Sequence, residues 1–498
     1  MKITTQDWNK MRRERPPDQQ LRILQVNTSD RSGGAQRSAW NLFQTYRARG
    51  HKSWLAVGYK RTDDPDVLVI PNGNRFPFLW RYVDDGMERG FRWLEKKIRG
   101  VWRLEKHYRA LRHPLQVLEK SLGLESFHHP STRGILNVSP EKPDILHCHN
   151  LHGYYFDLRV LPWLSRQVPV ILNLRDAWLL SGHCAHSLDC ERWRIGCGSC
   201  PYLSVYPPIR RDATAYNWRR KQAIYAHSTV YVTSPSQWLM RKVEQSMLAP
   251  AIIEARVIPN AVDLSVFRPY DKRQARMALS LPPNPKTKIL LFTANDIRQN
   301  RWKDYQTMRA AVALVAERLK GQEVLFIALG EDAPAERIGQ AEIRFVPYQK
   351  DPGAVARYYQ AADVYVHAAR AEVWGLTITE ALACGTPVVA TAVGGIVEQV
   401  KGLGISDGGF CHSDLNRYSL DDATGLLVAA ADAQGMAFGV ERLLQDNPLR
   451  LRMGENAVRD AVQRFDLQRQ ADAFLRWYQE IVKAWVSRHC PTSGDQRL

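Results

Sequence analysis

The feature that most constrains the fold is a repeated order of short apolar runs, glycine-bearing or polar turns, and amphipathic stretches. The first instance passes from an apolar run at residues 22–26 through a turn at 32–36 to an amphipathic stretch at 39–46. A second apolar run follows at 53–57. Short apolar runs bounded by turns indicate strands, and apolar residues recurring every three or four positions indicate helices. A strand–turn–helix–strand unit predicts a parallel α/β sheet, because a crossover helix joins parallel strands.

The same order recurs in two series along the chain. The first series continues with apolar runs at residues 144–147, 169–173 and 230–234. The second series has runs at residues 288–292, 324–328, 343–346, 364–367 and 387–390. A connection rich in proline and asparagine at residues 257–270 separates them. The sequence therefore predicts two α/β domains, at residues 1–258 and 259–470.

Residues 75–135 depart from this order and predict an insertion in the first domain. From Phe91 to Tyr108, apolar residues recur at helical spacing and basic residues fill the gaps. Such a basic amphipathic helix lies in the headgroup region of an anionic membrane, or packs on its own domain. The whole chain has 69 Lys and Arg against 51 Asp and Glu, a formal net charge of +18. This excess favours an anionic partner, and we expect peripheral contact with a membrane surface.

The most informative motif places two carboxylates, Glu372 and Glu380, on either side of a turn that follows a strand and opens a helix. Between them, Gly375, Leu376 and Thr377 present backbone N–H groups at the start of that helix. A helix start attracts anions, because its first N–H groups have no intrahelical acceptor and the helix dipole is positive there. The motif predicts a phosphate site with carboxylates beside it for the hydroxyls of a sugar or ribose. The alternative is a capped helix with solvated acids.

In this region the chain resembles the family-4 retaining glycosyltransferases of the GT-B fold. The segments that carry the resemblance are residues 257–263 (VIPNAVD), 359–365 (YQAADVY), 372–380, 384–390 (CGTPVVA), 394–398 (GGIVE) and 422–427 (DATGLL). The resemblance covers most of the chain and is strongest over residues 257–470. It implies two Rossmann-like, doubly wound domains that face a central cleft, and a C-terminal helix at 471–498 that returns to the first domain.

The resemblance also implies roles for individual residues on the donor side. Glu372 would face the donor sugar at the reacting centre, and Glu380 would hold the nucleotide ribose. Trp374 stands where the family usually has phenylalanine. The donor diphosphate would be bound by Lys303 and by an arginine of the same loop. Arg298 is the preferred arginine, and Arg301 competes with it.

In the first domain, Gly33 and Gly34 match the glycine loop of the family, where backbone comes close to a phosphate or sugar, and the resemblance implies that they contact the donor. Three histidines follow another strand, and the resemblance implies that one of them lies at the reacting centre. His149 and His152 are the candidates, whereas a packing role fits His147. A metal site built from these histidines is the alternative.

One strand later, Asp176 is a candidate contact for acceptor hydroxyls. The family commonly has His-Asp at this point, and Arg175 takes the place of that histidine. Asp64 and Asp66 have the D-x-D spacing of metal-dependent sugar transferases, but they lie in a turn before a strand of the first domain. The sequence therefore predicts metal-independent catalysis.

Half of the cysteines fall in the segment 183–201, at Cys184, Cys190, Cys197 and Cys200. A subset of polysaccharide-building members of the family resembles this segment. Four thiolates can hold structural zinc tetrahedrally, and the last two cysteines have the Cys-x2-Cys ligand spacing. Disulfides or free thiols are the alternatives, and His183 or His186 could replace one zinc ligand.

These observations predict a glycosyltransferase that moves a hexose from a nucleotide-diphosphate sugar to a saccharide or lipid-linked acceptor, with retention, in polysaccharide or cell-envelope glycan synthesis. Nucleic acid is not an expected partner. The alternatives are a nucleotide-sugar epimerase of the same fold and a basic nucleic-acid-binding protein with a zinc site. The polar N-terminal segment has no apolar core of a secretion signal, which favours the cytoplasm.

Overall fold

The computed structural model describes residues 20–31, 33–71, 114–284, 286–319, 321–406, 409–410 and 418–489. The predicted basic helix at residues 91–108 lies outside these ranges, so its contact with a membrane stays a prediction. Within the described part of the chain, no helix combines the length and the apolar character needed to cross a bilayer.

The chain divides into two compact units. The first comprises Met1–Thr233, Arg241–Arg256 and Trp477–Leu498, and the second comprises Ser234–Met240 and Val257–Arg476. The division therefore falls close to the predicted border after residue 258, and again within the last helix, α16 (Leu467–His489).

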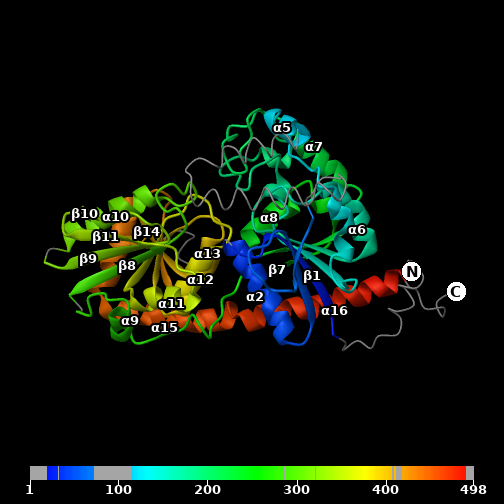
Figure 1. Ribbon diagram of the computed structural model, residues 1–498. Coiled ribbons are helices and arrows are strands. Elements are labelled where there is room, and N and C mark those ends of the chain that lie inside the picture. Colours follow the sequence, from blue (N-terminus) through cyan, green and yellow to red (C-terminus); the bar gives the residue numbers. More distant parts are fainter. Residues whose placement is uncertain are drawn as a thin grey trace, which may run out of the picture. The chain divides into compact units, whose positions relative to one another are not determined.

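The first unit is built on a seven-stranded sheet in the order β3-β2-β1-β4-β5-β6-β7 (Figure 1). The central pairings, β1 with β2 and β1 with β4, are parallel. The strands are β1 (Arg22–Ser29), β2 (Lys52–Tyr59), β3 (Val67–Val69), β4 (Ile145–Cys148), β5 (Val170–Asn173), β6 (Val230–Ser234) and β7 (Ile252–Val257). The α-helices are α2 (Gly34–Ala48), α5 (Pro114–Ser121), α6 (Leu161–Gln167), α7 (Thr214–Tyr225) and the second half of α8 (Gln237–Glu244), whose first half belongs to the second unit.

The second unit contains a nine-stranded sheet in the order β10-β11-β9-β8-β12-β13-β16-β14-β15. Its strands are β8 (Thr287–Thr293), β9 (Glu323–Leu329), β10 (Glu336–Ile338), β11 (Ala341–Val346), β12 (Val364–His367), β13 (Val388–Thr391), β14 (Gly402–Ser406), β15 (Gly409–Phe410) and β16 (Gly425–Val428). The outer pairs β10–β11 and β14–β15 are antiparallel, whereas β8 pairs in parallel with β9 and β12.

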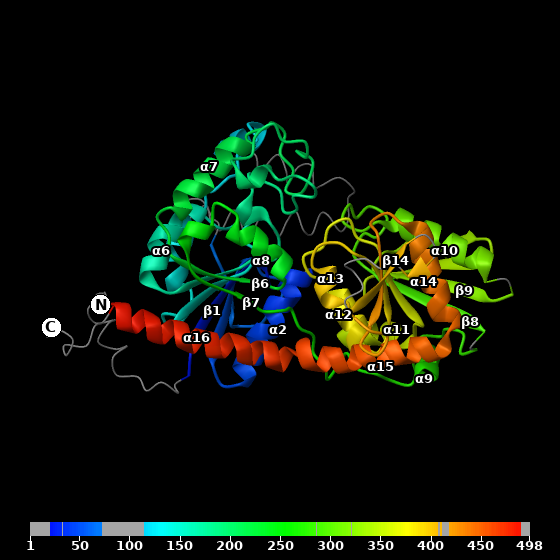
Figure 2. The same cartoon turned by 180° about the vertical axis from the view of Figure 1, so that it is seen from behind.

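Helices cover both faces of this second sheet. Figure 2 shows α10 and α14 side by side on one face, with α11 and α12 on the other. The helices are α9 (Lys272–Ala278), α10 (Tyr305–Arg318), α11 (Pro352–Ala361), α12 (Leu376–Ala383), α13 (Ile396–Gln399), α14 (Ala433–Gln445) and α15 (Asn447–Arg464). Because both faces are covered, the inner strands are continuous apolar runs, as in other parallel sheets. The two doubly wound, Rossmann-like domains expected from the sequence are confirmed.

Each sheet has a switch point, where successive strands change the direction in which they are added. In the first sheet, β2 and β3 extend from one side of β1, and β4 lies on its other side. In the second sheet, β9 and β11 extend from one side of β8, and β12 lies on its other side. Open α/β sheets bind ligands beyond the carboxyl ends of the strands at such points. The two switch points are therefore the places in this fold where functional side chains are expected.

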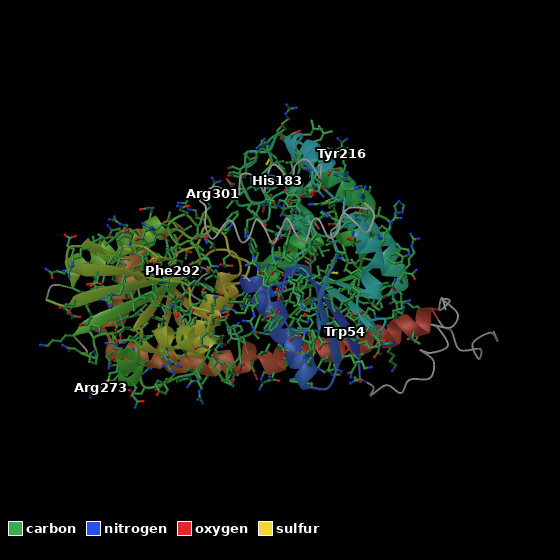
Figure 3. The ribbon with its side chains drawn as sticks, viewed as in Figure 1. Trp54, His183, Tyr216, Arg273, Phe292 and Arg301 are labelled. Carbon is green, nitrogen blue, oxygen red and sulfur yellow. The ribbon has the colours of Figure 1, made fainter. Side chains whose placement is uncertain are left out.

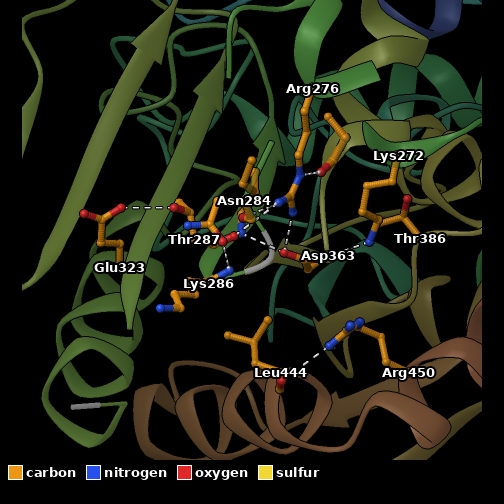
Figure 4. Close-up of polar contacts among 12 residues, drawn as sticks. Lys272, Arg276, Asn284, Lys286, Thr287, Glu323, Asp363, Thr386, Leu444 and Arg450 are labelled. Carbon is orange, nitrogen blue, oxygen red and sulfur yellow. Dashed lines mark hydrogen bonds and ion pairs between the residues drawn. The ribbon is translucent and has the colours of Figure 1, made fainter. Parts of the chain in front are cut away.

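A buried carboxylate anchors the switch-point strand of the second sheet (Figure 4). Asp363 accepts hydrogen bonds from the Arg276 guanidinium at 2.8 Å, the Lys272 ammonium at 2.9 Å and the backbone N–H of Ile289 at 2.9 Å. Burial alone would raise the pKa of Asp363, but the two cations outweigh burial and lower that pKa. The carboxylate thus joins helix α9 to the start of β12 and to β8.

Replacement of this carboxylate should destabilise the second unit. Asp363→Ala leaves the buried Arg276 without its carboxylate partner, which costs about 3–5 kcal/mol in the free energy of unfolding. Urea unfolding followed by circular dichroism measures the loss. Because the folded-state pKa of Asp363 is lowered, the stabilisation is present above the ordinary carboxyl pKa and disappears as the pH falls below it.

The matched control is Asp421→Ala, since the Asp421 side chain is 83% exposed and pairs with Arg452 at the surface. An exposed pair of this kind contributes less than about 1 kcal/mol. Equal stabilities of the two variants would contradict the anchoring role of Asp363.

Candidate functional site

The strongest site lies at the switch point of the second sheet, where the loop after β8 meets the loop after β12. Lys303 and Ala369 form an antiparallel bridge between these loops. Two further backbone hydrogen bonds flank the bridge, from Asp304 N–H to the Ala368 carbonyl at 3.0 Å and from Arg370 N–H to the Trp302 carbonyl at 2.9 Å. The backbone therefore fixes where Lys303 emerges relative to the residues that follow β12.

This pairing brings three ionisable side chains together. The ammonium of Lys303 forms a salt bridge with Glu372 and donates a hydrogen bond to Nε2 of His367 at 3.0 Å. Nε2 of His367 lies 3.8 Å from the Glu372 carboxylate. An ammonium can only donate, so the ring proton of a neutral His367 lies on Nδ1, 3.1 Å from the hydroxyl of Tyr365. The histidine is buried, but the Lys303 and Glu372 side chains keep 13% and 18% of their surface exposed.

The charges of this cluster are set by burial and by proximity. Burial, together with the Lys303 cation, lowers the pKa of His367 to about 4, so its ring is neutral at pH 7. Burial alone would raise the pKa of Glu372, but the neighbouring Lys303 and His367 outweigh burial and hold that pKa far below its usual range. The site therefore presents one cation and one carboxylate, both partly open to solvent.

Two glycines permit the turn that carries Glu372. Gly394 has a positive φ of 56°, and a Cβ on it would lie 2.0 Å from the carbonyl oxygen of Glu372. A Cβ on Gly395 would lie 2.0 Å from the carbonyl oxygen of Val373. The N–H of Gly395 donates to the Glu372 carbonyl at 2.9 Å. Larger residues at these two positions would displace the turn and with it the Glu372 carboxylate.

The side-chain amide of Gln399 holds the start of α12 through two hydrogen bonds, as a peptide group of a neighbouring strand would. The buried Gln399 accepts from the N–H of Gly375 at 2.8 Å and donates to the Gly375 carbonyl at 2.9 Å. Leu376 and Thr377 follow in the first turn of α12, where N–H groups have no acceptor within the helix. These N–H groups are the available anion donors of the motif.

The second carboxylate of the motif is covered. Glu380 is 1% exposed and accepts a hydrogen bond from the hydroxyl of Tyr359 at 2.8 Å. Trp374 also points inward, since it is 7% exposed and packs edge-on against Phe465 with ring centroids 5.5 Å apart. In this structure, Glu372 is thus the open carboxylate of the pair.

The structure does not bring the predicted arginine to Lys303. Arg298 pairs with Glu331, with Nε 2.5 Å from the carboxylate, and its guanidinium lies over the Phe345 ring at 5.1 Å. Arg301 lies in the same turn region and is exposed (labelled in Figure 3).

In the first unit, a second site lies at the switch point between β1 and β4. Gly33 caps the start of α2, directly after β1, and Gly34 is its first residue. After β4, Nε2 of His152 lies 2.8 Å from the Asp176 carboxylate, and Asp176 also accepts from the N–H of Trp178 at 2.9 Å. Burial alone would raise the pKa of Asp176, but His152 and the hydrogen bonds lower it. His152 and Asp176 keep 10% and 15% of their side-chain surface exposed.

The other two histidines belong to a buried network. His149 contacts Gln25 at 2.8 Å and Arg175 at 3.4 Å, and burial lowers its pKa well below the usual value. His147 lies 2.5 Å from the hydroxyl of Tyr478 in α16. The ring nitrogens of His147 and His149 are thus engaged in buried polar contacts. His152 is the histidine of this group that retains exposed surface beside an acid.

The remaining predicted positions have structural partners. Arg47 forms salt bridges with Asp64 at 2.8 Å and with Asp66 at 3.2 Å. Both carboxylates of the D-x-D motif are therefore paired with an arginine. The four cysteines of segment 183–201 are free thiols, not disulfides. Across the described ranges, no group of three or more His, Cys, Asp or Glu side chains is already placed to hold a metal ion.

Sequence reasoning missed two residues of the second-unit site. His367 is the last residue of an otherwise apolar strand, and that position was a signal, because ligand-facing groups follow the carboxyl ends of parallel strands. Gln399 lies 24 positions after Gly375 and has no local signal; only the tertiary fold brings its amide to the turn.

Residues 280–460 match the model of the family described as glycosyl transferases group 1. A putative colanic acid biosynthesis glycosyl transferase of Escherichia coli is 26% identical over 50% of this chain and 60% of its own length. D-inositol 3-phosphate glycosyltransferase 2 of Catenulispora acidiphila is 37% identical over 45% of this chain and 49% of its own length. The chain thus spans about half to three fifths of these two relatives.

Among solved structures, the Anabaena protein HepE in complex with UDP and glucose superimposes with a TM-score of 0.57. The sequence identity is 16%, over 92% of this chain and 99% of HepE. At this identity the likeness concerns the fold, and it confirms the expected GT-B architecture. The resemblance to group 1 glycosyltransferases is confirmed over the matched residues, and the assignment to the family-4 subset stays a prediction.

The contacts of Lys303 make its effect on His367 testable. Lys303→Met removes the cation that disfavours the protonated ring, so the pKa of His367 should rise from about 4 toward, but not to, the usual value of about 6.5, because burial remains. Histidine-labelled NMR across a pH titration measures the shift.

Lys303→Arg is the control, because it keeps a cation at this position. Its His367 pKa should stay near that of the unmodified protein. An unshifted His367 in Lys303→Met would show that Lys303 does not set the charge of the cluster.

Proposed function

We propose that this protein is a retaining glycosyltransferase that moves a hexose from a nucleotide-diphosphate sugar to a saccharide or lipid-linked acceptor. The observation that carries the proposal is the salt bridge between Lys303 and Glu372 at the switch point of the second sheet. It lies within the residues that match the group 1 glycosyltransferase family. A cation for a diphosphate and a carboxylate for sugar hydroxyls stand side by side at the expected ligand position of the fold.

The donor diphosphate would bind between Lys303 and the start of α12. Cleavage of the sugar–phosphate bond builds negative charge on the departing diphosphate. The Lys303 ammonium and the N–H groups of Leu376 and Thr377 are fixed donors that stabilise this charge. Arg298 would join them by releasing Glu331, and its own side chain is 43% exposed.

The two carboxylates of the motif would bind different parts of the donor, one the sugar and the other the ribose. Glu372 stays ionised at neutral pH and accepts hydrogen bonds from hydroxyls of the donor sugar. Glu380 would exchange its Tyr359 partner for the hydroxyls of the ribose. The neutral His367 orients Lys303 from the protein side.

The first unit would bind the acceptor through His152 and Asp176. The acceptor hydroxyl oxygen bonds to the anomeric carbon on the face from which the diphosphate leaves. The carbon–oxygen bond to the diphosphate breaks, and the hydroxyl proton passes to a phosphate oxygen of that leaving group. No protein nucleophile takes part. This same-face attack retains the anomeric configuration.

The biological setting of the proposal is cell-envelope or polysaccharide synthesis. It is supported by the colanic acid relative. A lipid-linked acceptor on the cytoplasmic face of a membrane would suit the basic segment at residues 91–108. Incubation of the protein with the donor alone distinguishes the epimerase alternative from transfer. An epimerase converts the donor without a second substrate, whereas a transferase consumes it only when an acceptor is present.

The two motif carboxylates should differ in the kinetic parameter they control. Glu380→Ala should weaken nucleotide binding roughly 10- to 100-fold, the equivalent of one or two charge-assisted hydrogen bonds. Glu372→Ala should mainly lower kcat, by about 100-fold, because its contacts strengthen in the transition state. Isothermal titration with the nucleoside diphosphate and initial rates measure the two effects.

Glu455→Ala is the matched control, because Glu455 is an exposed residue of α15 in the same unit. It should leave both parameters unchanged. Unimpaired activity in both Glu372→Ala and Glu380→Ala would refute the assignment of this site.

Transfer should continue without added magnesium or manganese, during an exposure to EDTA too short to remove a structural zinc from the cysteine segment. The reason is that Lys303 and the start of α12 supply positive charge to the leaving diphosphate, the task that a divalent cation performs in metal-dependent transferases. Initial rates with EDTA, with magnesium and with manganese are compared. Activity that appears only with an added divalent cation would contradict this part of the proposal.

A further inference from the structure

A cavity in the first unit is lined by all four cysteines of segment 183–201. Its volume is about 20 Å³, room for one water-sized occupant. Further lining residues include His183, Trp193 and Thr214. The cysteines come from positions spread over seventeen residues, so the fold, and not sequence adjacency alone, gathers their sulfurs.

Backbone N–H groups donate hydrogen bonds to the sulfurs of the last two cysteines. The N–H of Gly182 donates to Sγ of Cys197 at 3.3 Å, and the N–H of Tyr202 donates to Sγ of Cys200 at 3.4 Å. Hydrogen bonds from backbone N–H groups to sulfur stabilise ligating cysteines and tune their sites. Such donors are of little use to a cysteine that merely fills an apolar core.

A buried histidine points its free ring nitrogen at the same sulfur group. Nδ1 of His183 lies 2.9 Å from the Pro207 carbonyl, and a carbonyl only accepts, so Nδ1 carries the ring proton. Nε2 of His183 then faces Cys200, with its nitrogen 3.6 Å from Sγ. Histidines that bind metals usually donate their other ring N–H to such an acceptor, so Nε2 of His183 is oriented toward the sulfur group as a ligand nitrogen would be. Figure 3 labels His183 in this segment.

Two lysines supply charge complementary to a thiolate cluster. Lys221 is fully buried and interacts electrostatically with Cys184 and Cys197, while it also pairs with Glu125 at 2.9 Å. Lys242 interacts with Cys184 and Cys190 and donates to Ser187 at 2.9 Å. One zinc ion with four thiolates leaves two negative charges, and buried charge requires a partner.

We propose that Cys184, Cys190, Cys197 and Cys200 bind one zinc ion in this cavity. All four thiols line one small cavity, and four thiolates are a ligand set of structural zinc. Each thiol that binds the metal releases its proton to solvent, so metal binding by four thiols releases four protons. The sulfurs contract around the ion, since no three such side chains in the described chain already stand at metal-binding separation.

The zinc would brace the wall beside His152 and Asp176. Ala185, next to the first cysteine, accepts from the N–H of Ala177 at 2.7 Å and donates to the Tyr206 carbonyl at 2.8 Å. Tyr206 in turn meets the His152 ring edge-on, with centroids 5.6 Å apart. The metal would have a structural role, and its binding does not depend on the proposed transferase activity.

Metal analysis of the full chain tests the proposal. The protein is produced with zinc in the medium and purified without a metal-affinity column or chelator. Elemental analysis should find about one zinc per chain, and Cys197→Ser and Cys200→Ser should each lower the zinc content at least tenfold. Cys384→Ser, a buried cysteine of the second unit, is the matched control and should retain the metal.

Mercurial titration of the unmodified protein covers the case in which a cysteine variant does not fold. Thiol modification should release zinc in proportion, until four thiols have reacted for each ion released. Three results would overturn the proposal: absence of zinc together with four reactive thiols, disulfides among the four cysteines in the native protein, or undiminished zinc in both serine variants. Absence of transferase activity in protein that contains its zinc would count against the proposed function, not against this site.

Discussion

The salt bridge between Lys303 and Glu372 is the interaction on which the site in the second unit depends. It exists because β8 and β12 are neighbours in the sheet, although Val364 lies 71 positions after Thr293 in the chain. Removing two charges from water costs free energy, and their mutual attraction offsets only part of that cost. Such a pair therefore contributes little to the stability of the fold. In the proposed function, Lys303 would exchange this carboxylate for a phosphate of the donor.

The surrounding structure is arranged to keep this pair in place. The bridge between Lys303 and Ala369 fixes one partner, and Gly394 and Gly395 allow the turn that carries the other. The carboxylate of Asp363 anchors the strand that leads into the site. In the first unit, His152 and Asp176 occupy the corresponding switch point beside the cysteine segment. In each unit, the candidate site therefore lies at the carboxyl ends of parallel strands, where the strand order changes direction. The side chains at the two sites differ.

The sequence predicted the sheets and the motif, because both rest on local patterns. Apolar runs such as residues 324–328 correspond to buried strands, and the turn after β12 opens a helix as the glycine-bearing motif implied. The partners of individual side chains were beyond local patterns. The pairing of Arg298 with Glu331, the covering of Glu380 by Tyr359 and the support of Gly375 by Gln399 all join distant segments. Edge strands such as β10 and β15 were also missed, because two or three residues carry no periodicity.

The central claim is that a nucleotide sugar binds at the carboxyl ends of β8 and β12. Hydrogen–deuterium exchange of the full chain, with and without UDP-, GDP- and ADP-sugars in turn, tests this most directly. With the cognate donor, exchange should slow in residues 293–303 and 369–380, and Lys303→Met should abolish the protection. Protection confined to the first unit, or an unchanged pattern with all three nucleotide sugars, would contradict the account.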